Sequence, residues 1–195
     1  MTAEDYAEVA RRHPAVQRAV ATFRWTGSWY TVFINVDRLG GREIDQAFER
    51  ELRAFFERYR MAGYDVEIEA PIFVPLELKL DICVRPHYFR TDVQRRLTKV
   101  FSSRDLPDGT RGVFHPDNFT FGQPVYLSRI YAAAQDVTGV ESVNVSVFRR
   151  RDDPSPVTVA PGGRIPLERL EIATLDNDPN HPERGLFTLT LEGGK

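Results

Sequence analysis

The spacing of apolar residues over residues 121–148 predicts a helix followed directly by a strand. Apolar side chains recur at helical spacing up to Val137, and from Ser142 onward they alternate with polar ones. Pro124 suits the first turn of this helix, and Gly139 suits the left-handed position after its end. Three valines are expected on one face of the strand: Val143, Val145 and Val147. This is the pattern of a packing element and not of a reactive site.

The first 70 residues predict a helix, a hairpin, a second helix and a strand. Thr2 is a suitable N-cap for a first helix that ends at the following His-Pro pair. Residues 17–25 and 29–37 have strand-like patterns on either side of a turn, which indicates an antiparallel hairpin. A short strand is expected at residues 65–69. Seven apolar residues mark the second helix: Ile44, Ala47, Phe48, Leu52, Phe55, Phe56 and Tyr59. The order α-β-β-α-β is ferredoxin-like without its first strand.

Residues 71–195 predict a second module, with the boundary at Ala70-Pro71. Residues 76–85 alternate strictly between apolar and polar side chains, so they form the clearest strand pattern in the chain. A helix is expected to start at Thr91, with Gln94 as its capping-box partner. Together with the helix and strand described first, the order is β-α-(β)-α-β, in which helices cover one face of a sheet.

Three further strands complete the predicted second module. A short one is expected at residues 112–114, inside a loop rich in turn residues, and two more at residues 165–175 and 186–191. The pattern of the last strand fits one arm of a half-buried hairpin. The predicted fold class is therefore α+β, with two consecutive ferredoxin-like two-layer α/β sandwich modules (residues 1–70 and 71–195) and a C-terminal β-hairpin extension.

The composition is that of an ordinary soluble globular protein, with 42% hydrophobic and 28% charged residues. A net charge of −2 argues against a dedicated nucleic-acid binder, which usually carries a basic excess. Cys83 is the only cysteine, so an internal disulfide and a cysteine-based zinc cage are both excluded. The polar, acidic start of the chain is unlike a signal peptide, and no apolar run approaches the roughly 20 residues that span a bilayer.

The residue types that most often carry chemistry stand in unfavourable surroundings. Each of the four histidines adjoins a proline, which favours a loop or turn position over a metal-ligand or catalytic role: His13, His87, His115 and His181. Cys83 falls on the polar face of its strand near Asp81, whereas a reactive thiolate needs an electropositive setting. No nucleophile elbow, phosphate-binding loop or dinucleotide fingerprint is present. We therefore predict no catalytic, cofactor-binding or metal-binding residues, no cofactor, no small-molecule substrate and no enzymatic activity.

Two groups of residues are candidates for a protein interface. Trp25 and Trp29 flank the hairpin turn, where they either pack on the first helix or anchor a protein contact. The basic run Arg149, Arg150 and Arg151 is either a solvated strand end or a patch for an acidic protein partner.

Several segments resemble a known family in their order and pattern. These are TAEDYAEVARRHPAVQRAVATFRW, APIFVPLELKLDICVRP, RTDVQRRLTKVF, PVYLSRIYAAAQDVTGVESVNV and GGRIPLERLEIATLD. The last four resemble the C-terminal half of the baseplate J-like family, the wedge proteins of contractile phage tails and related contractile injection systems. The first resembles the segment just before that half. Members usually carry a substantial further N-terminal part, so we expect either a fragment or a divergent short form.

The resemblance implies a structural role. Family members assemble with a second wedge subunit into a ring around the central spike hub, so it implies wedge and hub proteins as partners, with no nucleic acid and no membrane span. It also implies a cytoplasmic assembly that becomes part of a phage tail or injection-system particle. In the first module, a missing first strand would leave a sheet edge that a neighbouring chain could fill.

A ferredoxin-like RNA-binding or regulatory ligand-binding module is the alternative, and an enzyme comes third. Against RNA, the strands lack paired aromatic residues at alternate positions, and the net charge is negative. Against effector binding, no glycine-rich ligand loop stands out.

Overall fold

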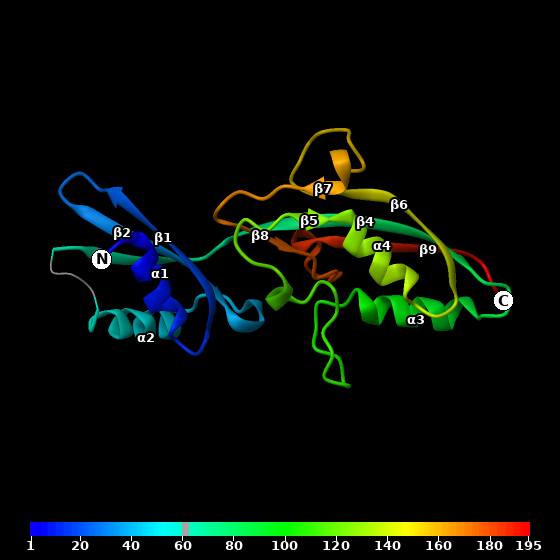
Figure 1. Ribbon diagram of the computed structural model, residues 1–195, viewed down its shortest axis with the longest axis horizontal. Coiled ribbons are helices and arrows are strands. Elements are labelled where there is room, and N and C mark those ends of the chain that lie inside the picture. Colours follow the sequence, from blue (N-terminus) through cyan, green and yellow to red (C-terminus); the bar gives the residue numbers. More distant parts are fainter. Residues whose placement is uncertain (60–62) are drawn as a thin grey trace. The chain divides into compact units, whose positions relative to one another are not determined.

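The structure is a computed structural model that describes residues 1–59 and 63–195 (Figure 1). The chain is divided into two compact units. Unit 1 contains residues 1–72 and two short later segments, 120–122 and 168–172, and unit 2 contains the remaining residues. The predicted α+β class is confirmed, because each unit combines helices with a sheet.

Unit 1 has the predicted order of elements. They are α1 (Ala3–Arg11), β1 (Val16–Trp25), β2 (Tyr30–Arg38), the short helix η1 (Leu39–Gly41), α2 (Gln46–Phe56) and β3 (Asp65–Glu69). β1 and β2 form the predicted antiparallel hairpin, and β3 pairs with β2 in parallel, which gives a sheet of order β1-β2-β3.

The specific ferredoxin-like arrangement is not found in unit 1. In a ferredoxin-like sheet the two parallel strands of a βαβ unit are separated by another strand. Here β2 and β3 pair directly over residues 31–35 and 65–69, so no position is left between them for a missing first strand. The open positions are instead the two outer edges, along β1 and β3.

Local sequence signals explain both helices of unit 1. Thr2 forms a capping box with Asp5, since each side chain bonds the other residue's backbone N–H at 3.2 Å and 2.6 Å. Asp45 caps α2 by accepting the Phe48 N–H at 2.8 Å. The helices bury one apolar stripe each against alternate residues of β1 and β2, and the largest members of this core are Tyr6, Ile34, Phe48, Leu52 and Phe56.

The elements after unit 1 are built around one long strand. They are β4 (Ile72–Val84), α3 (Arg90–Val100), η2 (Pro116–Asn118), β5 (Val125–Tyr126), α4 (Leu127–Gln135), β6 (Val140–Arg150), η3 (Pro161–Gly163), β7 (Arg164–Ile165), β8 (Glu171–Thr174), η4 (Pro182–Arg184) and β9 (Leu186–Gly193). β4 has thirteen residues and lies between β6 on one side and β8 and β9 on the other, while β5 pairs with β7 (Figure 1). Its apolar residues are buried at every second position, as predicted, from Val74 to Val84.

The predicted C-terminal hairpin is wrong. β9 pairs with β4 in parallel, with Glu77 opposite Leu186 and Val84 opposite Gly193, and it does not pair with β8. The length of β4 accounts for this, because one side of a thirteen-residue strand can hold two short strands in succession. The turn signals of the intervening loop indicated that the chain reverses, but they did not specify which strand β9 joins.

Three local predictions in unit 2 also need correction. The N-cap of α3 is Phe89, so Thr91 lies inside the helix and forms no capping box, and the Arg90 N–H is instead accepted by the Lys195 carbonyl at 3.2 Å. Residues 112–114 form a turn and not a strand. In β6, a register shift at Ser146 breaks the alternation, so Val147 pairs with Lys79 and faces away from Val145.

The ends of α4 also differ from prediction. The helix begins at Leu127, after the short strand β5, so Pro124 precedes it and does not lie in its first turn. Its C-cap is Asp136, three residues before Gly139. Gly139 does have the predicted positive φ of 103°, but it makes the turn that leads into β6.

Candidate protein-interaction surfaces

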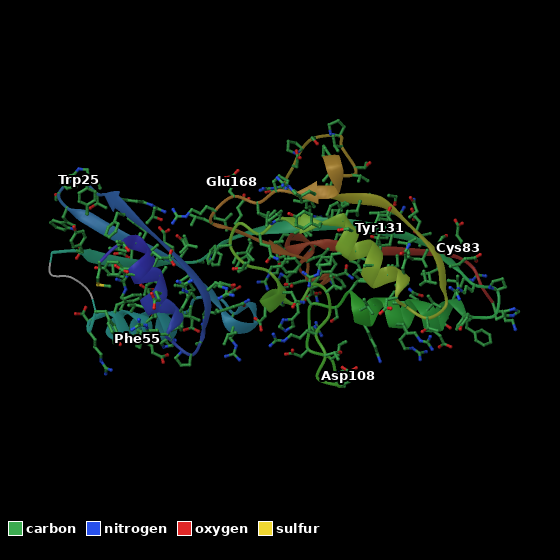
Figure 2. All side chains as sticks on the ribbon, in the orientation of Figure 1. Trp25, Phe55, Cys83, Asp108, Tyr131 and Glu168 are labelled. Atoms are coloured by element: carbon green, nitrogen blue, oxygen red, sulfur yellow. The ribbon has the colours of Figure 1, made fainter. Side chains whose placement is uncertain are left out.

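The tip of the β1–β2 hairpin carries three exposed aromatic side chains. Trp25 is 60% exposed, Trp29 52% and Tyr30 50%. Trp25 and Tyr30 pair across the hairpin with their rings edge to face, 5.2 Å apart. The turn between them closes where Thr26 donates to the Trp29 carbonyl from its backbone N–H at 3.1 Å and its hydroxyl at 3.0 Å. We call these three residues the aromatic tip; Figure 2 labels Trp25.

The structure brings both predicted tryptophans into the aromatic tip. More than half of each tryptophan residue is exposed, so these amphipathic residues present apolar surface to solvent. Beside Trp29 lies an open hollow of about 270 Å³, lined also by Gly63, Tyr64 and Asp65. The sequence analysis did not select Tyr30. The signal that could have identified it was its position directly after Trp29, which places it opposite Trp25 when the two strands pair.

The arginine run at the end of β6 is largely paired within the chain. Arg149 directs both Nε and Nη2 at the Glu77 carboxylate, each at 2.8 Å. Arg150 makes a two-pronged contact with Asp152 at 3.0 and 2.9 Å, and this hydrogen bonding holds the pKa of the Asp152 carboxyl below its usual value. Arg151 lies in an exposed turn. These internal pairs reduce the charge that the first two arginines could offer to a partner.

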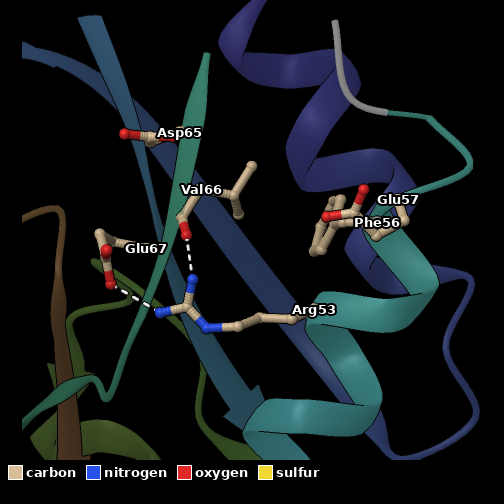
Figure 3. A pocket seen from close by; sticks show the side chains of 6 residues that line it. All are labelled: Arg53, Phe56, Glu57, Asp65, Val66 and Glu67. Carbon is tan, nitrogen blue, oxygen red and sulfur yellow. Dashed lines mark hydrogen bonds and ion pairs between the residues drawn. The ribbon is translucent and has the colours of Figure 1, made fainter. Parts of the chain in front are cut away.

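The outer edge of β3 is partly covered by one side chain from α2. The Arg53 guanidinium donates to the Val66 carbonyl and pairs with Glu67 at 2.7 Å (Figure 3). It also pairs with Glu49 at 2.9 Å. Burial opposes its ionisation, but the two carboxylates outweigh burial, so the pKa of Arg53 is raised. Next to it is an open hollow of about 360 Å³, lined by Arg53, Phe56, Glu57, Asp65, Val66 and Glu67.

An arginine also covers a carbonyl on β1, the strand at the other edge of this sheet. Arg169, in one of the later segments that belong to unit 1, donates from Nη2 to the Ala21 carbonyl at 3.0 Å. Sequence patterns could not predict either contact, because both join residues that are distant in the chain and neither arginine stands in a recognisable motif.

All four histidines lie outside helices and strands, as predicted. The two buried ones form the same local structure. His13 Nδ1 accepts the Ala15 N–H at 3.3 Å, and His115 Nδ1 accepts the Asp117 N–H at 3.2 Å, so the histidine closes a His-Pro turn. In the neutral ring the proton is then on Nε2. This nitrogen faces Glu51 in the case of His13 and Asp105 in the case of His115. These histidines are structural parts of turns.

The half-buried Cys83 lies 3.7 Å from a Glu141 carboxylate oxygen, which is not the electropositive setting of an activated thiol. Within residues 1–59 and 63–195, no three or more His, Cys, Asp or Glu side chains converge as metal ligands would. No helix in this part of the chain is long and apolar enough to cross a membrane.

Comparison with known families gives a match to unit 1. Residues 1–69, which hold the aromatic tip and the β3 edge, match the model of the Baseplate J-like central domain. This part of the chain is a baseplate J-like domain. The family suggested by the sequence resemblance is thus confirmed.

The fold of the chain is also found in a solved structure. A chain from the cryo-EM structure of the anti-feeding prophage baseplate matches with a TM-score of 0.56 over 88% of this chain, at 12% sequence identity. At that identity the match shows a shared fold. The residues matched amount to 36% of the prophage baseplate chain, so the present chain spans little more than a third of it. No curated protein matches significantly in sequence.

Proposed function

We propose that this chain is a structural subunit of the baseplate of a contractile injection system or phage tail. In this role it acts by protein–protein assembly with other wedge subunits and with the spike and hub proteins. The match of residues 1–69 to the baseplate J-like central domain carries the proposal. The shared fold with a chain of the anti-feeding prophage baseplate supports it. The resulting location is the tail or injection particle.

Within that role, we assign the aromatic tip to a protein contact. Tryptophan and tyrosine are the residue types that most often dominate binding energy at interfaces, because each buries a large rigid surface with little loss of side-chain freedom. Trp25, Trp29 and Tyr30 offer three such exposed side chains at the tip of one hairpin, and the rings of Trp25 and Tyr30 are in contact. Of the three arginines in the basic run, the exposed Arg151 is the one we retain as an interface candidate.

The alternative of RNA binding is not favoured by the sheet face opposite the helices. There Phe33 is covered by the Arg24 guanidinium, 4.2 Å from the ring centre, and therefore does not offer a free stacking surface. On β3, Glu67 lies opposite Phe33 and Glu69 lies opposite Asn35, and carboxylates repel phosphate.

Light scattering of the purified chain, alone and mixed with tail proteins encoded beside it, tests the proposal. We expect a defined complex with a second wedge subunit or a hub protein. Alanine at Trp25 or Trp29 should weaken that complex about 30-fold, which corresponds to a hot-spot loss of about 2 kcal/mol. Alanine at Tyr126, a 48% exposed aromatic residue in unit 2, is the matched control. A closed homo-oligomer that ignores the tail proteins would refute the baseplate role, and binding of RNA at low salt would favour the alternative.

A further inference from the structure

We propose that the outer edge of β3 accepts an added β-strand from another protein chain, and that this strand carries lysine or arginine side chains. The inference rests on the proposed function in one respect: the chain that supplies the added strand is taken to be another baseplate protein. It concerns an edge on the opposite side of the sheet from β1, and it does not depend on the aromatic tip.

The backbone of β3 is arranged for such an addition. Within the part of the chain that the structure describes, β2 is the one strand that pairs with β3, so the other side of β3 is a sheet edge. In a parallel ladder, alternate residues direct both N–H and C=O at the neighbouring strand, and the others direct both outward. The Val66 carbonyl accepts a hydrogen bond from a side chain of α2, which places Val66, and by alternation Ile68, among the outward-facing residues.

Arg53 shows which chemistry this edge attracts. Its guanidinium performs two tasks that an incoming basic strand would perform: an N–H donates to the Val66 carbonyl, and the positive charge pairs with Glu67. The side chain is 38% exposed, and both of its carboxylate partners are also partly exposed. Exposed ion pairs of this kind contribute little to stability, so Arg53 can be displaced. It protects the edge from indiscriminate pairing, which is how natural sheets commonly treat their edges.

The hollow beside the edge favours a basic strand over an acidic one. Among the described residues that line it, three are acidic, Glu57, Asp65 and Glu67, and one, Arg53, is basic. Its volume of about 360 Å³ gives room for a long side chain from an added strand (Figure 3). A lysine or arginine there would gain carboxylate partners, whereas a glutamate would meet like charge.

A peptide titration on the whole chain tests the inference without any baseplate protein. The probe is a labelled peptide, Thr-Val-Lys-Val-Arg-Val-Lys-Thr, compared with a version that has glutamate at the three basic positions and with one N-methylated at alternate amides. We expect the basic peptide to bind, as seen by fluorescence anisotropy, and to slow amide exchange at Val66 and Ile68. We expect the acidic and N-methylated peptides not to bind, because one lacks the charge and the other the backbone donors.

Substitution of Arg53 adds a second readout. Arg53→Ala removes the side chain that competes for the edge and should raise the affinity of the basic peptide about tenfold. Arg50→Ala, on the same helix and bonded to Gln46, should leave affinity unchanged. Two results with the unaltered chain would each overturn the inference. One is that the basic peptide does not bind, and the other is that the N-methylated or the acidic peptide binds equally well. Since no tail protein takes part, either result leaves the proposed baseplate role to its own test.

Discussion

Replacing Leu52 by alanine is expected to destabilise unit 1 while unit 2 stays folded. Leu52 lies on α2 with none of its surface exposed, in the core formed by α1, α2 and the three-stranded sheet. Leu80, on β4, is equally buried in unit 2, so Leu80→Ala is the matched substitution for the other half of the chain.

The expected loss follows from the packing around Leu52. Its core contains the rigid aromatic rings of Tyr6, Phe48 and Phe56, which cannot collapse fully into the space that the missing carbons leave. Buried Leu→Ala substitutions cost about 2–5 kcal/mol, and we expect about 3 kcal/mol here. With a urea dependence of about 1.5 kcal/mol per molar for a unit of this size, the midpoint of unfolding should fall by about 2 M.

The two tryptophans provide an assay specific to unit 1. Both tryptophans of the chain, Trp25 and Trp29, lie in this unit, so tryptophan fluorescence follows its unfolding, while far-UV circular dichroism follows both units. Leu52→Ala should shift the fluorescence transition and leave a later dichroism transition in place. Leu80→Ala should do the reverse. One superimposable transition in both signals, shifted equally by either substitution, would refute independent folding of the two units.

Three further substitutions test individual features. Thr2→Ala removes the capping box of α1 and should cost about 1 kcal/mol in urea unfolding followed by fluorescence, whereas Thr2→Ser should cost almost nothing. The Phe48 N–H holds the pKa of Asp45 below its ordinary 3.8, so the carboxylate stabilises unit 1 above that pH and loses its effect as pH falls through the lowered pKa. Asp45→Asn should keep the cap and flatten this acid dependence; an unchanged pH profile would contradict it. At Gly112 an added Cβ would overlap the Ser102 carbonyl oxygen, so Gly112→Ala should destabilise unit 2 by about 1–3 kcal/mol in melting followed by dichroism, and unaltered melting would contradict the close approach.

Features that depend on neighbours in the sequence could be predicted. The cap at Thr2, the hairpin of β1 and β2, and the alternation along β4 were predictable because each is determined by residues a few positions apart. The turn positions of the histidines followed from the adjacent prolines in the same way.

Features that depend on distant partners could not be predicted. The pattern of residues 186–191 indicated a half-buried strand, but periodicity alone does not say that β4 is its neighbour. The register shift at Ser146 is equally invisible, since the valines on either side alternate regularly in sequence. For the candidate site, the tryptophans could be selected as interface candidates from the sequence, but their exposure could not be predicted, because a ring at a turn has the same pattern whether it is packed or free.

The pairing of β4 with β9 affects how the chain folds as it leaves the ribosome. Glu77 lies opposite Leu186, more than one hundred positions later, whereas the three strands of the unit 1 sheet all lie within the first 69 residues. Contacts between distant residues form slowly because a long loop must close first. During synthesis, the sheet of unit 1 can therefore assemble early, while one side of β4 stays unpaired until residues 186–193 have emerged. For that interval β4 is the segment most exposed to wrong pairing, and chaperone binding should concentrate there.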